Sequence, residues 1–205
     1  MKVAVLGGTG AFGSALARRL VGAGLEVSIG SREPDRAAAT AAELGASRGV
    51  ANEHAVDGVE LVVLSVLASA ALTTAAELAD AIDETPVLSV ASEVRVAGGA
   101  AFPGDDPLSL AERTQELLQG PVVAGLHSLA AASLASGKAA GDALVCGDDE
   151  AAKARALELA AQLVTGRAFD AGPLASARAL EGMTSVIVNL NRRYRGHAGV
   201  RIEGL

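Results

Sequence analysis

Residues 2–13, Lys-Val-Ala-Val-Leu-Gly-Gly-Thr-Gly-Ala-Phe-Gly, decide the fold of this chain. An apolar run of strand character leads directly into the glycines, and a helical pattern follows them. The spacing Gly8-x-Gly10-x-x-Gly13 in that context is the fingerprint of a dinucleotide-binding turn. Gly8 is expected to form the tight turn, Gly10 to let backbone approach a pyrophosphate, and Gly13 to let helix and strand pack closely. The alternative is a glycine-rich turn that binds no ligand.

The end of the second predicted strand, residues 26–30, indicates which dinucleotide binds. An NAD site carries a carboxylate there, which accepts a hydrogen bond from the ribose 2′-hydroxyl. In this chain Ser31 and Arg32 follow the strand, and Arg36 lies one helical turn further on. A guanidinium offers a planar fork of donors that suits a 2′-phosphate, so the sequence predicts NADP. The alternative is that both arginines are solvated charges at the start of a helix.

Composition narrows the class of protein. The chain has 205 residues, of which 50% are hydrophobic, so it can bury a core in one domain with at most a small additional part. A net charge of −7 and an aromatic content of 2% argue against nucleic acid and membrane surfaces as partners. No apolar run is long enough to span a bilayer, and no signal segment precedes the first strand. The single cysteine, Cys146, fits a reducing compartment, so we expect a cytoplasmic protein.

Strands and helices alternate along the first half of the chain. The pattern predicts strands over residues 2–6, 26–30, 59–65 and 86–91, with helices over residues 14–21, 35–44 and 69–82 between them. This alternation predicts an α/β fold with a Rossmann-type, doubly wound parallel sheet covered by helices on both faces. Residues 92–107 are rich in glycine and proline, which predicts a long loop.

The second half of the chain is less regular. It predicts a helix over 108–119, strands over 121–126 and 143–147, a helix over 150–164, an extended piece over 167–170 and a final helix over 174–194. We expect residues 1–147 to form the dinucleotide-binding domain. Residues 148–205 should then form a small C-terminal part, helical or mixed, that packs on it.

Ligands of open parallel sheets bind outside the carboxyl ends of the strands. Ser65 and Val66 follow the third predicted strand, Ala91 and Ser92 follow the fourth, and His127 follows the next. We expect the first four to line the nicotinamide side and His127 to face the second substrate, where it could orient a carbonyl or pass a proton. The alternative is a capping or core histidine. Because the three histidines and the cysteine lack metal-ligand spacing, no metal is predicted.

Five short motifs carry a resemblance to a known family: Val3–Gly10, Gly30–Arg32, Leu126–His127, Val145–Asp149 and Asp170–Leu174. With these motifs in this order, the sequence resembles the NADPH-dependent coenzyme F420 reductases (F420H2:NADP oxidoreductases). The resemblance implies a Rossmann domain with a small C-terminal part, a homodimer, and direct hydride transfer between NADP(H) and the deazaflavin of F420. It also implies that four residues hold the NADP phosphates and adenosine ribose, namely Thr9, Ser31, Arg32 and Arg36.

The predicted function is therefore hydride exchange between NADP(H) and coenzyme F420, with catalysis chiefly by positioning of two stacked rings. His127 is the catalytic candidate. The expected cofactor-binding residues are Gly7, Gly8, Thr9, Gly10, Ala11, Phe12, Gly13, Ser31, Arg32, Arg36, Ser65, Val66, Ala91 and Ser92. On the acceptor side the chain departs from the family pattern at residues 66–68, 91–94 and 129–130. Two alternatives follow: an NADP-dependent reductase of a small carbonyl or imine, and a non-catalytic NADP-binding redox sensor.

Overall fold

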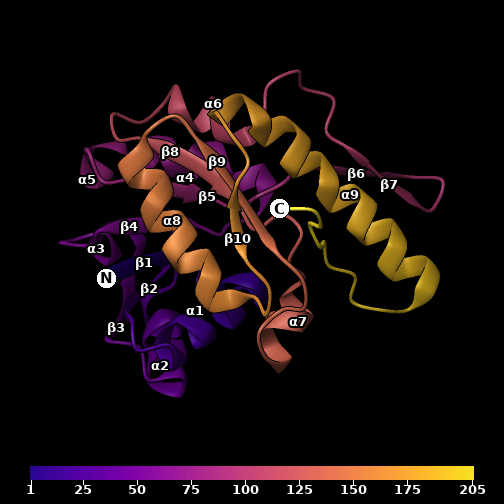
Figure 1. Ribbon diagram of the computed structural model, residues 1–205. Coiled ribbons are helices and arrows are strands. Elements are labelled where there is room, and N and C mark those ends of the chain that lie inside the picture. Colours follow the sequence, from indigo (N-terminus) through magenta and orange to yellow (C-terminus); the bar gives the residue numbers. More distant parts are fainter.

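Short apolar runs form the strands of one sheet in the computed structural model, which describes residues 1–205 (Figure 1). The eight strands are β1 (Lys2–Leu6), β2 (Glu26–Ser31), β3 (Arg48–Ala51), β4 (Leu61–Leu64), β5 (Val87–Ser89), β8 (Val122–Gly125), β9 (Ala143–Gly147) and β10 (Ala168–Asp170). Their order across the sheet is β10-β9-β8-β5-β4-β1-β2-β3. The strand order reverses beside β1, and a doubly wound sheet binds its ligand at such a point.

Helices cover both faces of the sheet (Figure 1). They are α1 (Ala11–Gly22), α2 (Pro34–Leu44), α3 (Asn52–Ala55), α4 (Ala68–Glu77), α5 (Ala79–Ile82), α6 (Leu110–Gln115), α7 (Ala131–Ser136), α8 (Glu150–Leu163) and α9 (Ala177–Tyr194), with a 3₁₀ turn, η1 (Leu174–Ser176), before α9. None of these helices combines the length and the apolar character that a bilayer crossing requires.

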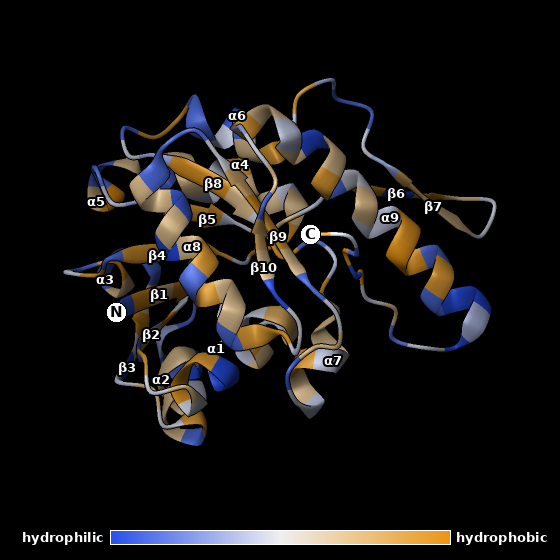
Figure 2. Cartoon of the chain, in the orientation of Figure 1, coloured by the Kyte–Doolittle hydropathy of each residue, from blue (hydrophilic) through white to orange (hydrophobic).

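The core consists of two layers, one on each face of the sheet. Successive residues of a strand point to opposite faces, so Val3 and Val5 of β1 join the layer under α1 and α8, whereas Ala4 and Leu6 join the layer under α4 and α6. Because both faces are covered, the central strands are apolar at nearly every position. Figure 2 shows this apolar character along the central strands.

Strand direction departs from the prediction in one place. The six strands from β3 to β8 run parallel, as expected from the strand–helix alternation. β9 instead pairs antiparallel with β8, and β10 then pairs parallel with β9. The predicted doubly wound parallel sheet therefore holds from β3 to β8, and the antiparallel direction of β9 is an addition that the strand–helix alternation did not predict. The C-terminal segment after residue 147 contributes both α8, which packs on the sheet, and β10, which extends it.

The predicted loop over residues 92–107 is also wrong, because it contains an antiparallel hairpin of β6 (Val94–Ala97) and β7 (Ala100–Pro103). Gly98 and Gly99 form the two-residue turn with φ of +56° and +79°. Such a turn needs positive φ at both positions, which glycine adopts without strain. The hairpin lies along α9 (Figure 1). Asn189 of α9 both accepts from the N–H of Ala101 and donates to its carbonyl, each at 2.8 Å.

Three further segments differ from the expected pattern. Residues 45–58, expected to be a plain connection, contain β3 and α3. The helix expected over 69–82 is interrupted at Leu78, between α4 and α5, and the helix expected over 108–119 is limited to α6. α7 was not expected at all. It packs against α1 below the sheet.

Polar contacts tie α9 and the tail after it to the body of the protein. Glu181 of α9 is buried and accepts hydrogen bonds from the backbone N–H groups of Leu110 and Ala111 at the start of α6, at 3.0 and 3.1 Å. Burial raises the pKa of this carboxyl to about 7. Asp142 accepts from the N–H groups of Arg167 and Ile202, each at 2.7 Å. These two backbone bonds lower the pKa of Asp142.

Candidate active site

The carboxyl edge of the sheet begins with the glycine turn after β1. Gly7 has a φ of +74°, and a Cβ atom on it would lie 2.6 Å from the carbonyl oxygen of Ser65. The residue that needs glycine for the tight turn is therefore Gly7, not Gly8 as expected from the motif. A Cβ on Gly8 would meet the carbonyl oxygen of Val5 at 2.9 Å, so this position is restricted by packing.

Gly13 shows the close packing that the motif predicts. A Cβ on Gly13 would lie 2.4 Å from the carbonyl oxygen of Gly7, so α1 can approach the turn only with glycine there. Gly10 is exposed and precedes α1 as its N-cap, with no side chain that caps the helix. Ala11 is exposed beside it and Phe12 is half-buried. The first N–H groups of α1 are thus open to an anion, which the helix dipole also favours.

Ser31, at the end of β2, lies beside this turn. Its hydroxyl is 3.5 Å from the Thr9 hydroxyl and accepts from the backbone N–H of Glu33 at 3.1 Å. Arg36 of α2 donates to the backbone carbonyl of Thr9 at 3.3 Å. Arg32 is exposed and forms no ion pair. The fold brings these predicted phosphate-binding residues to one place on the rim.

The sequence analysis overlooked one residue here, Glu33. Its carboxylate is 3.7 Å from the guanidinium of Arg36, and both side chains are mostly exposed. The signal was present in the sequence, since an acid three residues before an arginine on a helix start is a common pairing. Glu33 adds negative charge beside the predicted phosphate site and would compete with a phosphate for Arg36.

A row of buried polar atoms without partners follows the carboxyl ends of the next strands. These atoms are Ser65 Oγ after β4, Ser89 Oγ at the end of β5, and His127 Nε2 and Ser128 Oγ after β8. Buried polar groups are normally hydrogen-bonded, and an orphan one costs free energy. Four such atoms along the edge of one sheet therefore fit a site that a polar ligand completes. Val66 lies against Gly7, and Ala91 is buried close to the same edge.

His127 is held by two other side chains. Its Nδ1 is 3.0 Å from the Ser92 hydroxyl, which is 2.8 Å from the Thr184 hydroxyl of α9, and Thr184 donates to the backbone carbonyl of His127 at 3.0 Å. The preceding residue, Leu126, is buried with a φ of +66°, a strained conformation for a side chain of this kind. Burial lowers the pKa of His127 to about 4, so the ring is neutral at physiological pH.

Thr184 is a functional candidate that the sequence analysis missed. It lies in the apolar centre of the final helix, where Ser185 also has an orphan buried hydroxyl. Polar residues within an apolar helical run are the signal that could have indicated them.

The single cysteine adds no further reactive group. Burial raises the pKa of the Cys146 thiol to about 12, which leaves it unreactive. The structure contains no group of three His, Cys, Asp or Glu side chains arranged to hold a metal ion.

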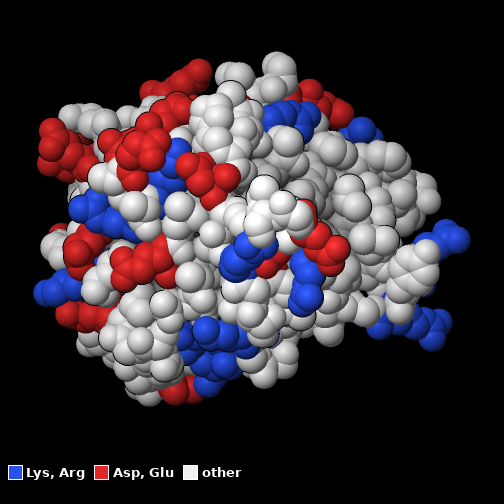
Figure 3. Space-filling model, in the orientation of Figure 1, with Lys and Arg blue, Asp and Glu red and all other residues white.

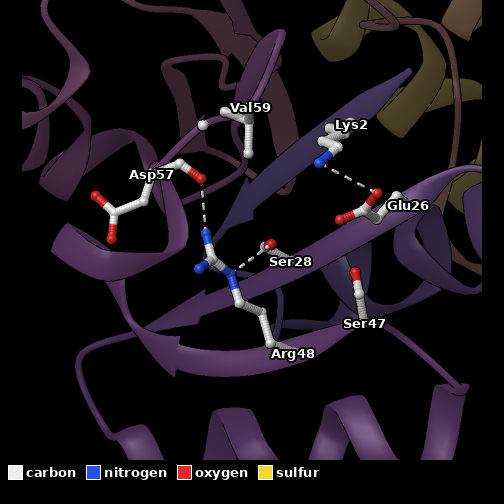
Figure 4. A pocket seen from close by; sticks show the side chains of 8 residues that line it. Lys2, Glu26, Ser28, Ser47, Arg48, Asp57 and Val59 are labelled. Carbon is white, nitrogen blue, oxygen red and sulfur yellow. Dashed lines mark hydrogen bonds and ion pairs between the residues drawn. The ribbon is translucent and has the colours of Figure 1, made fainter.

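A polar pocket also lies at the opposite, amino edge of the sheet (Figure 4). Arg48 of β3 crosses it and donates to the Ser28 hydroxyl at 3.0 Å and to the Asp57 carbonyl at 2.9 Å. Lys2 and Glu26 form an ion pair there at 3.6 Å. Through its Nε and Nη2 donors, which bind protein oxygens, Arg48 joins β2, β3 and the turn after α3. We assign this pocket no ligand.

Comparisons with known proteins agree with this geometry. A family described as "NADP oxidoreductase coenzyme F420-dependent" matches residues 2–93. The F420-dependent NADP reductase of Methanothermobacter marburgensis is 33% identical, over 100% of this chain and 99% of the relative. The chain belongs to this family. Membership confirms the resemblance predicted from the sequence.

Solved structures extend the family match to the fold. A crystal structure from Arthrobacter sp. FB24, described as a candidate F420-dependent NADP reductase, has 25% sequence identity and a TM-score of 0.83, covering 100% of this chain and 99% of that one. This match confirms the predicted Rossmann-type fold class. An imine reductase from Streptomyces aurantiacus has 22% identity and a TM-score of 0.64, over 95% of this chain and 62% of that one, and shares the fold alone.

Proposed function

We propose that this member of the F420-dependent NADP oxidoreductase family transfers a hydride between NADP(H) and coenzyme F420. One observation carries the proposal. The same sheet edge holds an open glycine turn with an uncapped helix N-terminus and, beside it, the row of unpartnered polar atoms that ends at His127. The first part suits a dinucleotide phosphate, and the second suits the polar edge of a bound ring. The full-length match to an F420-dependent NADP reductase supports the choice of both substrates.

NADP would be held from β1 to α2. The proposed pyrophosphate site is the turn from Gly7 to Gly13, where backbone N–H groups and the α1 dipole face the anion. The hydroxyls of Thr9 and Ser31 and the guanidinium groups of Arg32 and Arg36 would hold the adenosine ribose and its 2′-phosphate. The contact of Arg36 with Thr9 supports this assignment, because it brings the α2 arginine to the glycine turn before ligand binds.

The ring side of the site would be lined by Ser65, Val66, Ala91 and Ser92, with His127 toward the acceptor. When bound, the nicotinamide and deazaflavin rings supply the hydride chemistry themselves. The protein's part is to hold both rings at reacting distance and to keep water out. Neutral His127 cannot supply a proton by ionising near pH 7, because its pKa is lowered to about 4. It would act as a fixed polar contact.

We also propose that the protein forms a homodimer in the cytoplasm. Each subunit would consist of a dinucleotide-binding domain over residues 1–147 and a C-terminal part over residues 148–205. Support for the dimer comes from α9, where Val186, Leu190 and Tyr194 are 56%, 39% and 71% exposed. These residues recur at four-residue intervals, so they form one stripe along the helix. Figure 2 shows apolar colour on the middle turns of α9 and hydrophilic colour at its far end. Analytical ultracentrifugation of the wild type and of Leu190→Glu tests this proposal, since a dimer through this stripe would dissociate in the variant.

The activity test is an absorbance assay of purified protein with NADPH and oxidised F420, with NADH run in parallel. Loss of the deazaflavin absorbance with NADPH, and little with NADH, is the expected result. Absence of turnover despite NADPH binding by calorimetry would contradict F420 as the acceptor. Small carbonyl and imine substrates would then be assayed, and a chain that binds NADPH but reduces none of them would fit the redox-sensor alternative.

A further inference from the structure

Three side chains from separate parts of the chain form a closed hydrogen-bonded group at the carboxyl edge of the sheet. Ser92 follows β5, His127 follows β8, and Thr184 lies on α9. The Ser92 hydroxyl bridges His127 Nδ1 at 3.0 Å and the Thr184 hydroxyl at 2.8 Å. Thr184 in turn donates to the His127 carbonyl at 3.0 Å. Each hydroxyl has a single hydrogen, so the protons in this group can be counted.

The count fixes the tautomer of the imidazole. Thr184 gives its only hydrogen to the backbone carbonyl of His127, so toward Ser92 it can only accept. Ser92 therefore donates to Thr184 and has no hydrogen left for the ring. The contact at 3.0 Å then requires His127 Nδ1–H to donate to Ser92. Because the ring is neutral near pH 7, with its pKa lowered by burial to about 4, Nε2 then carries no hydrogen, and this buried atom has no partner in the protein.

We propose that Ser92 is a positioning residue that fixes His127 in the Nδ1–H tautomer, so that Nε2 accepts a hydrogen bond from an N–H group of a bound substrate. An orphan buried acceptor favours a ligand that carries a donor, because that ligand gains a hydrogen bond that the protein itself does not supply to this atom. Two ligand groups have this chemistry: the ring imide N–H of a deazaflavin and the carboxamide N–H of a nicotinamide. The identity of these ligands rests on the proposed function, whereas the tautomer does not.

The first test is spectroscopic and needs no ligand. Long-range ¹H–¹⁵N correlation spectra of ¹⁵N-histidine-labelled protein report which ring nitrogen carries the proton, and the variants His54→Asn and His197→Asn identify the other two histidines. We expect Nδ1–H in the wild type, unchanged from pH 8 to about 5 because the pKa of His127 is about 4. An Nε2–H signal in the wild type would overturn the proposal.

Substitutions of Ser92 and Thr184 test whether this hydrogen-bonded group sets the tautomer. In Ser92→Ala the ring loses its acceptor, so the signals should move away from a single Nδ1–H tautomer. In Thr184→Val the Ser92 hydroxyl is released to donate to Nδ1, so the ring should change to Nε2–H. Ser92→Thr keeps the hydroxyl and should keep the wild-type pattern. A pure Nδ1–H tautomer in folded Ser92→Ala, checked by circular dichroism, would show that Ser92 does not set it.

The second test separates the two candidate donors. We expect the Kd of one ligand, measured by calorimetry with oxidised F420 and with NADPH, to rise about 3- to 10-fold in Ser92→Ala, the range for one neutral hydrogen bond. A rise for F420 alone identifies the imide, and a rise for NADPH alone identifies the carboxamide. Ser28→Ala, a buried serine at the opposite edge of the sheet, should change neither. Unchanged affinity for both ligands in Ser92→Ala would overturn the proposal, whereas a wild type that binds no F420 would contradict the proposed function and leave the tautomer result standing.

Discussion

Charge at single residues sets the proposed preference for NADP over NAD. Arg32 is exposed and unpaired, and Arg36 contacts the glycine turn. Glu33 lies between them in the sequence and is paired with Arg36 at 3.7 Å. An exposed pair of this kind is weak, so a phosphate with two negative charges can displace the carboxylate. If the proposed assignment holds, the three side chains together would determine how much the 2′-phosphate contributes to binding.

Arg32→Ala tests the 2′-phosphate assignment. A charge-assisted hydrogen bond contributes about 1.5–3 kcal/mol, so the Kd for NADPH should rise roughly 10- to 100-fold. The Kd for NADH should change little, because NADH has no phosphate at that position. Calorimetry with both nucleotides measures the difference. Arg18→Ala is the control, since Arg18 pairs with Glu43 on the outside of α1 and α2, and equal losses for both nucleotides in Arg32→Ala would contradict the assignment.

Glu33→Gln should have the opposite effect. It removes a negative charge from the site and releases Arg36, so NADPH should bind roughly 2- to 5-fold more tightly, in line with the small energy of exposed pairs. Glu43→Gln breaks a comparable exposed pair with Arg18 at 2.7 Å and should leave NADPH binding unchanged. Weaker binding in Glu33→Gln would indicate that this carboxylate contacts the ribose instead. The gain should diminish at high salt.

At the residue level, local spacing predicted which side chains lie together, although it assigned the tight turn to Gly8 when Gly7 makes it. The glycines and the residues after β2 are fixed by short-range spacing, and the fold brings Thr9, Ser31 and Arg36 together as expected. Thr184 could not be placed this way. It comes within hydrogen-bonding distance of Ser92 only because α9 packs across the sheet, and this packing joins residues 92 positions apart in the sequence.

Among the elements, α1 shows most directly how one side-chain atom decides packing. Gly13 near its start is crowded by neighbouring backbone, whereas Gly22 at its end faces open space. A Cβ on Gly13 would lie 2.4 Å from the Gly7 carbonyl, whereas a Cβ on Gly22 would meet nothing within 4 Å. A glycine-to-alanine substitution is therefore expected to destabilise the protein at Gly13 and to stabilise it at Gly22.

Gly13→Ala should destabilise the protein by about 1–3 kcal/mol, the usual cost of overpacking. It should also weaken NADPH binding, because the turn must move away from α1. Gly22→Ala should instead stabilise by about 0.5–1 kcal/mol, since alanine favours the helix. Urea unfolding of both variants measures the free energies. A neutral Gly13→Ala would mean that the turn and α1 do not need this close approach.

Elements predicted from the sequence were reliable where hydrophobic pattern alone defines them. β1, β2 and α2 were predicted almost to the residue, including the end of α2 at Gly45, which has a φ of +71°. The hairpin of β6 and β7 was missed, although Gly98-Gly99 between short apolar runs is a strong hairpin signal. Nearby prolines and glycines favoured a loop instead. The direction of β9 has no signature in its own residues, because it is set by which strand it pairs with.

At the scale of the whole molecule, two buried titratable groups act on stability in opposite senses. The pKa of His127 falls from 6.5 to about 4 on folding, so the unfolded chain binds its proton first and stability falls as pH drops through that window. The pKa of Glu181 rises from 4.5 to about 7, so the folded protein binds its proton first and stability rises over a similar window. Each effect amounts to about 3 kcal/mol, so they nearly cancel.

Glu181→Gln should therefore expose the effect of His127. Between pH 7 and pH 4.5, the free energy of unfolding of the wild type should change little, whereas that of Glu181→Gln should fall by about 3 kcal/mol as pH drops. Denaturant titrations at several pH values test this expectation. His127→Asn should show the reverse, a gain in stability toward pH 4.5. Parallel curves for the wild type and Glu181→Gln would contradict a raised Glu181 pKa.

Charge on the outside of the molecule is mixed in sign. The face in Figure 3 shows acidic and basic side chains interspersed, with one compact basic cluster near the lower edge of the view, and the net charge of the chain is −7. Basic side chains do stand at the far end of α9 in the same view, where the helix dipole favours them. This arrangement agrees with a small-molecule substrate and gives no large positive surface for nucleic acid on that face.

Both edge strands of the eight-stranded sheet are short. β10 has three residues and β3 has four, and no longer strand lies at either border. The unpaired backbone groups of an edge strand can pair with further chains and start a fibril, and a short edge strand offers few such groups. We therefore expect the native protein to resist aggregation by strand addition even when it is concentrated. In the dimer proposed above, two copies would then associate through the side chains of α9, and each would keep its own eight-stranded sheet.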